Sequence, residues 1–272
     1  MMSNLDSVRD HYRATGLTDR LRTALAVLGP EDQRLTPQQL AALDQFHTRG
    51  LAATADLAKL ADLTADMSVL DVGSGVGGPA RFLAATYGCR VTGIDLSEPF
   101  VDAARYLTTR TGQAERVTFE AGDALNLPFD DGRFDAVFLQ HVAMNIVDRP
   151  RLYREMRRVL KRGGKFATFD VVANEGEPYY PVPWARNPAT SFLLSAEATR
   201  EAIEPAGFRT LAFQDDTEEA KAWFTQLRAA WPPPSPNLSV VMGPDFGELA
   251  VNLGRNVMEG RLGVLIAVFE AA

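Results

Sequence analysis

The sequence predicts an α/β fold with a seven-stranded, mostly parallel sheet that helices cover on both faces. Three observations lead to this fold class. Strand-like and helix-like segments alternate from residue 68 to residue 172, a pattern that builds a parallel sheet. A glycine-rich turn, residues 73–78, follows the first strand. An apolar run at 263–270 supplies a strand that completes the sheet with an antiparallel last pair.

The core strands are expected at 68–73, 90–95, 117–121, 134–140 and 164–172. Before them, Thr36 and Gln39 frame a helix start with proline at its first position. After them, the proline-rich residues 174–188 exclude a helix or a central strand. Ser195 is expected to cap a helix, 207–213 to form a strand, and 251–257 to lie on a helix. The chain therefore divides into an N-terminal helical lid, 1–64, and a ligand-binding core, 65–272, with insertions near 173–195 and 217–260.

Composition limits the possible partners. Lys and Arg number 28 against 35 Asp and Glu, a net charge of −7, so no nucleic acid is expected. The basic residues between 154 and 165 alternate with apolar ones at helical spacing, which predicts the solvated face of a helix. Cys89 is the single cysteine and is expected to pack as a small hydrophobe. The apolar run 262–269 is shorter than the ~20 residues that span a bilayer, so we expect a cytoplasmic enzyme that does not enter the membrane.

The most informative segment is residues 69–78, Val-Leu-Asp-Val-Gly-Ser-Gly-Val-Gly-Gly. It predicts a strand, a tight turn and the start of a helix. Glycine suits such a turn because it adopts positive φ and lets a ligand approach the backbone. Asp95 ends the next strand about 20 residues later, where a carboxylate can bind the hydroxyls of a ribose. The two segments together indicate an adenosine-bearing cofactor.

The glycine pattern also satisfies the dinucleotide fingerprint, so the cofactor depends on its surroundings. Asp71 at the strand end would repel a pyrophosphate and favour a cation. The amino acid end and sulfonium of S-adenosylmethionine carry positive charge. Asp123 and Ala124, after the third strand, can bind an adenine ring through a carboxylate and a backbone N–H. A nicotinamide-dependent oxidoreductase is the alternative that these residues disfavour.

These motifs, together with 134–140 and 160–169, resemble those of the class I S-adenosylmethionine-dependent methyltransferases over residues 65–175. The resemblance implies a Rossmann-like fold, S-adenosyl-L-methionine as cofactor and S-adenosyl-L-homocysteine as product. Cofactor contacts are then expected from Asp71, Gly73, Ser74, Gly75, Gly77, Asp95, Leu96, Gly122, Asp123, Ala124, Gln140 and Gln45. No metal is expected.

Segments outside the core resemble the type 11 and sarcosine/dimethylglycine methyltransferase-like subgroup that acts on small molecules. They are residues 140–145, 179–184, 252–260 and the lid motif 46–50. Arg49 stands where the resemblance implies a glycine, and it adds charge and bulk near the mouth of the pocket. The aromatic residues of 179–184 could stack on a cationic amine, enclose a flat quinol or polyketide, or simply pack the lid onto the core.

Two of the three histidines, His141 first and His47 as the alternative, are candidates for a general base that takes a proton from the nucleophile of the acceptor. His141 follows the fourth strand at its carboxyl end, and His47 lies in a break between N-terminal helices. Either is catalytic or a hydrogen-bonded structural imidazole. His11 is expected on the surface of an N-terminal helix.

The favoured function is methyl transfer from S-adenosylmethionine to a small-molecule acceptor: an amine, a phenol or enol, or a carbon nucleophile. The alternatives are a cyclase of the same fold that keeps the cofactor as a scaffold, and a non-catalytic binding module. The oligomeric state is left open, with a homodimer as one option.

Overall fold

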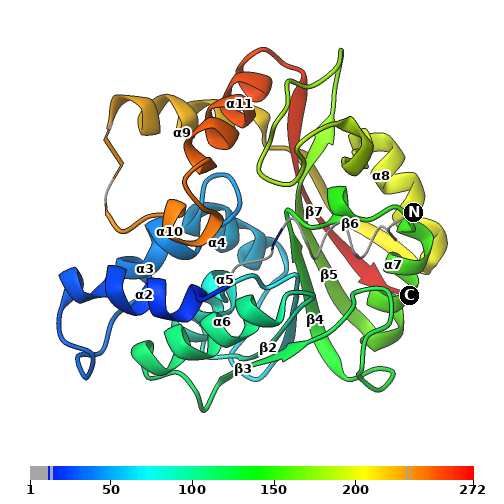
Figure 1. Cartoon of the computed structure of the whole chain (residues 1–272). Helices are drawn as coiled ribbons and strands as arrows, with labels where there is room; N and C mark the ends of the chain where they lie inside the picture. The colour runs from blue at the N-terminus through cyan, green and yellow to red at the C-terminus, as the bar shows by residue number, and fades with distance from the viewer. Residues whose placement is uncertain (1–11, 13–14, 231, 234) are drawn as a thin grey trace.

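The computed structural model describes residue 12 and residues 15–230, 232–233 and 235–272. His11 lies outside them. In these residues seven strands form one sheet in the order β3-β2-β1-β4-β5-β7-β6, with helices on both sides (Figure 1). Strands β1 to β5 are parallel, and β7 runs antiparallel between β5 and β6. The predicted fold class is confirmed.

The strands are β1 Ser68–Val72, β2 Arg90–Asp95, β3 Val117–Ala121, β4 Phe134–Gln140, β5 Leu160–Ala173, β6 Phe208–Asp215 and β7 Leu262–Ala271. Strand β5 begins earlier than the predicted residue 164. The two glycines at 163 and 164 suggested a turn, but the register between β4 and β5 shifts there instead. The strand therefore accommodates the glycines as an irregularity rather than ending at them.

The helices are α2 Leu17–Leu25, α3 Pro37–Asp44, α4 Leu51–Leu60, α5 Gly78–Tyr87, α6 Glu98–Thr111, α7 Arg149–Val159, α8 Ala196–Ile203, α9 Thr217–Ala229, α10 Ser239–Met242 and α11 Phe246–Met258. Thr36 and Gln39 form the predicted reciprocal cap of α3, and the Ser195 side chain caps α8. Residues 174–187 contain no helix and no strand of the sheet, as expected, although Val182 and Ala185 form an isolated β-bridge and a 3-10 helix begins at Pro188. No helix among the described residues is long and apolar enough to span a membrane.

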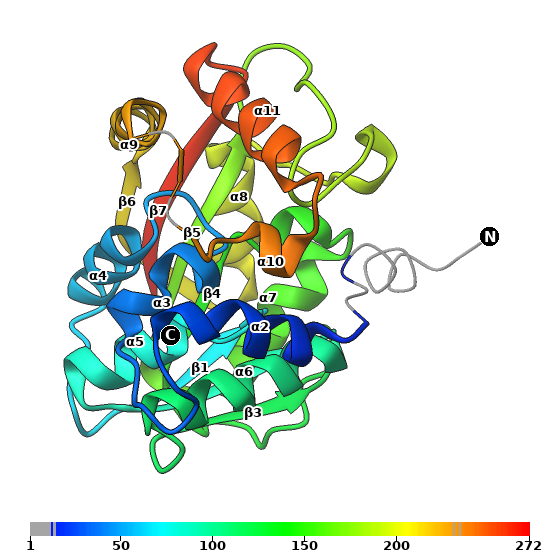
Figure 2. The ribbon, with the colours of Figure 1, turned by 60° about the vertical axis from the view of Figure 1, so that its left-hand side comes forward.

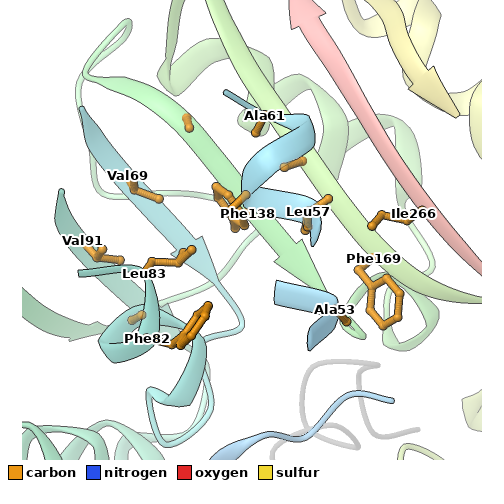
Figure 3. Packing of buried hydrophobic residues seen from close by; sticks show 14 of the residues in the cluster. Ala53, Leu57, Ala61, Val69, Phe82, Leu83, Val91, Phe138, Phe169 and Ile266 are labelled. Carbon is orange, nitrogen blue, oxygen red and sulfur yellow. The ribbon is translucent and has the colours of Figure 1, made fainter. Parts of the chain in front are cut away.

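Alternating side chains of the strands fill two cores, one on each face of the sheet. On one face Ala53, Leu57 and Ala61 of α4 and the residue after it lie against Phe138 and Phe169 of the sheet (Figure 3). Helices α5 and α11 extend this core, and Cys89 is buried in it. On the other face α7 and α8 cover the sheet. Helix α4 therefore belongs to the cover of the sheet.

A third core joins segments from opposite ends of the chain. Leu21 of α2 and Leu40 of α3 pack with Phe100 of α6 and Val241 of α10. Figure 2 shows α2, α3 and α10 side by side above α6. The N-terminal helices and the late insertion thus meet next to the carboxyl ends of β1 and β2.

Candidate active site

The loop between β1 and α5 approaches its neighbours too closely for side chains. Gly73 and Gly75 have φ of 71° and 54°. A Cβ at Gly73 would lie 2.3 Å from Cγ2 of Val142, and one at Gly75 would lie 2.9 Å from Cε2 of Phe46. The N–H groups of Gly73 and Ser74 donate to the carbonyl oxygen of Ile94 at 2.8 and 3.0 Å. These two hydrogen bonds thus hold the loop against β2.

Asp95 at the end of β2 connects this loop to the start of α6. One carboxylate oxygen accepts the N–H of Gly75 at 2.8 Å, and the other accepts the N–H of Ser97 at 2.8 Å. Burial raises the pKa of the Asp95 carboxyl, although both backbone donors act against this shift. Because each carboxylate oxygen can accept more than one hydrogen bond, the group can still bind two hydroxyls.

The segment after β3 lies beside Asp95 at the end of β2. The Gly122 N–H donates to the Asp95 carbonyl oxygen at 2.9 Å, and the Asp123 carboxylate accepts the Leu125 N–H at 2.9 Å. One cavity contains most of the predicted cofactor residues, namely Gly73, Gly75, Asp95, Leu96, Gly122, Asp123, Ala124 and Gln140. The structure therefore brings together residues from the ends of β1, β2, β3 and β4.

Four predicted residues lie behind this cavity and do not line it: Asp71, Ser74, Gly77 and Gln45. Asp71 is 2% exposed, and burial, with Asp95 nearby, raises its pKa to about 7. Gly77 is the N-cap of α5, with φ of 81°. The Gln45 amide donates to the Asp44 carboxylate at 3.0 Å. Asp71 is therefore buried and does not line the cavity, and its expected contact with the cofactor stays a prediction.

His141 lines the cavity just beyond β4. Its φ is 54°, a left-handed conformation uncommon for histidine, and its N–H donates to the Phe169 carbonyl oxygen at 2.8 Å. The imidazole stacks on the Phe169 ring with centroids 5.4 Å apart, and Nε2 lies 3.4 Å from Thr48 Oγ1. Burial, followed by the neighbouring His47, lowers the pKa of His141 well below its usual value. The imidazole is therefore neutral.

His47 does not line the cavity but takes part in a buried hydrogen-bond chain. Nε2 lies 3.0 Å from the Gly50 carbonyl oxygen, so it must carry the proton. The same Nε2 is 3.0 Å from Thr54 Oγ1, which donates to Oε1 of Gln140 at 3.0 Å. Burial lowers the pKa of His47 to about 4. This series of hydrogen bonds orients the amide of Gln140. Its Nε2 is buried and has no partner among the described residues, so it is available to bind a ligand.

The rest of the cavity wall is largely apolar, and sequence patterns identified only part of it. Phe46, Met144, Pro183, Trp184 and Leu253 lie in the segments 46–50, 140–145, 179–184 and 252–260 that the sequence indicated. Sequence patterns did not indicate Phe100, Ile146, Leu238, Met242 and Phe246 as wall residues. The cavity is also lined by Tyr12, Val72, Ile94, Ser97, Leu125, Val142 and Asn145. The region around α10 carried no signal because its helix is only four residues long.

These residues fit the cofactor that the sequence suggested. Gly73 and Gly75 of the loop line the cavity together with the carboxylates of Asp95 and Asp123, and Gln140 Nε2 is a buried polar atom of a lining residue without a partner among the described residues. No Lys or Arg is among the lining residues that the structure describes, so a pyrophosphate would lack a cationic partner. The sheet order and the site at its carboxyl edge define a Rossmann-like protein that binds an adenosine cofactor.

Comparison with known proteins specifies the class. Residues 70–168 match the family model described as a methyltransferase domain. The chain is 32% identical over 185 residues to a sterol 24-C-methyltransferase of Eremothecium gossypii, covering 64% of this chain and 49% of that protein. It is 30% identical to the sarcosine/dimethylglycine N-methyltransferase of Halorhodospira halochloris, covering 60% and 59%. The chain thus spans about half the length of such relatives.

A solved structure matches nearly the whole chain. The crystal structure of the [4+2]-cyclase SpnF is 25% identical, with a TM-score of 0.70, and the match covers 99% of this chain and 97% of that one. The fold, the site and the sequence relatives agree. Residues 70–168 form a methyltransferase domain, and the chain is similar to methyltransferases that act on sterols and on sarcosine or dimethylglycine.

Proposed function

We propose that this protein transfers the methyl group of S-adenosylmethionine to a small-molecule acceptor. One observation carries the proposal. A single cavity runs from the glycine loop and Asp95 to His141 and the apolar wall. When bound, the cofactor supplies an electrophilic methyl group for in-line displacement by a nucleophile.

The chain's own residues have two tasks in this proposal. Asp95 and Asp123 hold the cofactor at one end of the cavity, and the apolar wall holds the acceptor at the other. Fixing two reactants in this way can lower the barrier by roughly 7 kcal/mol or more. His141, neutral and inside the cavity, accepts a hydrogen bond or proton from the acceptor. His47, through Thr54, orients Gln140 and is assigned a positioning role.

We also propose that the segment up to Gly50 closes over the bound ligands. Phe46 lines the cavity and its ring packs edge-on against Phe100 with centroids 5.7 Å apart. Because Phe46 comes from the loop after α3, opening that loop would expose the cavity to solvent. Of the predicted lid residues, those before 12 and residues 13–14 lie outside the described part of the chain.

Calorimetric titration with S-adenosylmethionine and S-adenosylhomocysteine tests the cofactor site. Asp95→Ala should weaken binding of both by roughly 1.5 to 3 kcal/mol, the scale of losing hydrogen bonds to a charged group. Asp102→Ala is the matched control, because Asp102 lies on α6 with its side chain 60% exposed and does not line the cavity. Equal affinities for wild type and Asp95→Ala would remove Asp95 from the ribose site.

A cyclase reaction in the same cavity is the second candidate, and the likeness to SpnF favours it. The low pKa of His141 also suits a reaction that needs hydrogen bonding more than full proton abstraction. The two functions differ in the product. Methyl transfer adds one methyl group to the acceptor and forms S-adenosylhomocysteine, whereas cyclisation leaves the mass of the substrate and the cofactor unchanged. Mass spectrometry of a reaction mixture separates them.

A further inference from the structure

Among the described residues, the cavity wall away from Asp95 and Asp123 carries no ionised side chain. Most of this wall is apolar, namely Phe46, Met144, Pro183, Trp184, Leu238, Met242, Phe246 and Leu253. Tyr12 and Asn145 add uncharged polar groups to the lining. The Trp184 indole N–H donates to Ser191 Oγ at 2.9 Å, so this polar atom is already satisfied. The two carboxylates that line the cavity, Asp95 and Asp123, lie at the cofactor end.

Three arginines in the part of the chain that the structure describes, Arg49, Arg149 and Arg186, are engaged elsewhere. Arg49 binds the carboxylates of Asp216 and Asp56 at 2.8 and 2.7 Å. The Arg149 guanidinium donates to the carbonyl oxygens of Ile146 and Phe192 and to the hydroxyl of Tyr153. Arg186 pairs with Asp245 at 3.0 Å. Within the described residues, no Lys or Arg lines the cavity, and a phosphate or carboxylate on the acceptor would be buried without a cation.

A cationic acceptor is also disfavoured at the acceptor end of the cavity. Aromatic faces such as Trp184 attract a cation by about 2 kcal/mol when desolvated, but removing an ion from water costs several kcal/mol. The sulfonium of the cofactor would add repulsion. Besides Asp95 and Asp123, the polar side chains among the described lining residues are those of Tyr12, Ser97, Gln140, His141 and Asn145. All five are uncharged at pH 7, since burial raises the pKa of Tyr12 and lowers that of His141. Such groups suit an uncharged hydroxyl, carbonyl or enol.

We infer that the acceptor is an uncharged, mainly apolar molecule whose polar group lies at Gln140 and His141. The inference rests on the proposed function and names its acceptor class. The inferred acceptor class excludes phosphate-bearing and zwitterionic molecules. The deciding feature is the apolar wall, which two insertions and the loop after α3 build together.

Three probes with the same ring test the inference: 1-naphthol, 1-naphthyl phosphate and 1-naphthylmethylamine. Each is titrated calorimetrically at pH 7 into protein saturated with S-adenosylhomocysteine. We expect naphthol to bind at least 10-fold more tightly than either charged probe. Equal or tighter binding of a charged probe would overturn the inference, and so would a lack of saturable naphthol binding.

Two variants locate the effect in the cavity. Met242→Arg places a cation in the wall and should improve binding of naphthyl phosphate relative to naphthol at least 10-fold. Val251→Arg is the control, because Val251 on α11 is 66% exposed and does not line the cavity. The wall does not select the acceptor if both variants change the relative affinities for the probes equally. The same conclusion follows if a Met242→Arg variant with the wild-type melting temperature leaves these relative affinities unchanged. Failure of S-adenosylhomocysteine to bind would instead refute the proposed function.

Discussion

Arg49 has an unusual backbone and an unusual set of partners, and both can be tested by substitution. Its φ is 61°, in the left-handed region that glycine adopts most readily. Its guanidinium nonetheless donates to both oxygens of Asp216 at 2.8 Å and to Asp56 at 2.7 Å. The side chains of Arg49 and Asp216 are 13% and 9% exposed. This ion pair connects the loop after α3 with the start of α9, 167 residues later.

The expected cost of removing Arg49 follows from these contacts. Leaving one partner of a buried pair without its counter-ion costs about 3 to 5 kcal/mol, and the half-exposed Asp56 adds at most about 1 kcal/mol. Because the site is near the surface, we expect Arg49→Ala to lower the free energy of unfolding by about 3 kcal/mol at pH 8. Arg49→Gly should lose about 1 kcal/mol less, since glycine relieves the left-handed backbone.

The pH dependence of the loss identifies its cause. Burial raises the pKa of Asp216 to about 6 even with Arg49 present, so removing Arg49 must raise it further. At pH 8 the variants must bury a lone carboxylate, whereas at pH 5 this carboxyl is protonated in both variants and wild type. The deficit should therefore shrink as pH falls from 8 to 5.

Urea denaturation followed by circular dichroism at pH 8 and pH 5 measures these differences. Arg22→Ala is the matched control, because Arg22 also contacts two carboxylates but is 48% exposed, and its loss should leave stability nearly unchanged. Wild-type stability of Arg49→Ala, identical values for the alanine and glycine variants, or a deficit independent of pH would each refute part of this reasoning.

Three further predictions concern the site and its supports. His141→Ala should lower single-turnover methyl transfer by 10² to 10⁴ while cofactor affinity stays nearly intact; near-normal turnover in a destabilised variant would assign His141 to the fold. Burial raises the pKa of Asp170 to about 7, above its unfolded value, so its contribution to stability falls as pH rises from about 4 to 7. Asp170→Asn should therefore gain stability over wild type at pH 8 by up to about 4 kcal/mol but little at pH 4; the same difference at both pH values in thermal melts would contradict this. Amide hydrogen exchange at residues 45–49 should slow when S-adenosylhomocysteine binds, and unchanged rates would count against closure.

The core of the fold could be predicted from sequence because its signals are local. The alternation of apolar runs located every strand of the sheet to within a few residues, and the glycines required a turn after the first. Parallel pairing then placed the ends of β1, β2 and β3 at one edge, so Gly73, Asp95 and Asp123 had to meet. Thr36 and Ser195 correctly predicted helix starts, because each side chain accepts a backbone N–H from the first turn of its helix.

The acceptor side could not be predicted because its contacts join distant segments. Nothing local indicated that Met242, in a four-residue helix, would face Phe46 across one cavity. The pairing of Arg49 with Asp216 is equally remote, although the expected glycine at 49 was a correct hint of its positive φ. The sequence favoured His141 as the base and left His47 as the alternative, and of the two only His141 lines the cavity. Tertiary packing decided each of these cases.

The most direct test of the central claim is a crystal structure of the protein with S-adenosylhomocysteine. The account predicts the ribose hydroxyls at Asp95, the adenine beside Asp123 and Ala124, and the sulfur directed toward the side of the cavity that holds His141. Binding of the ligand elsewhere, or with its ribose away from Asp95, would contradict the account.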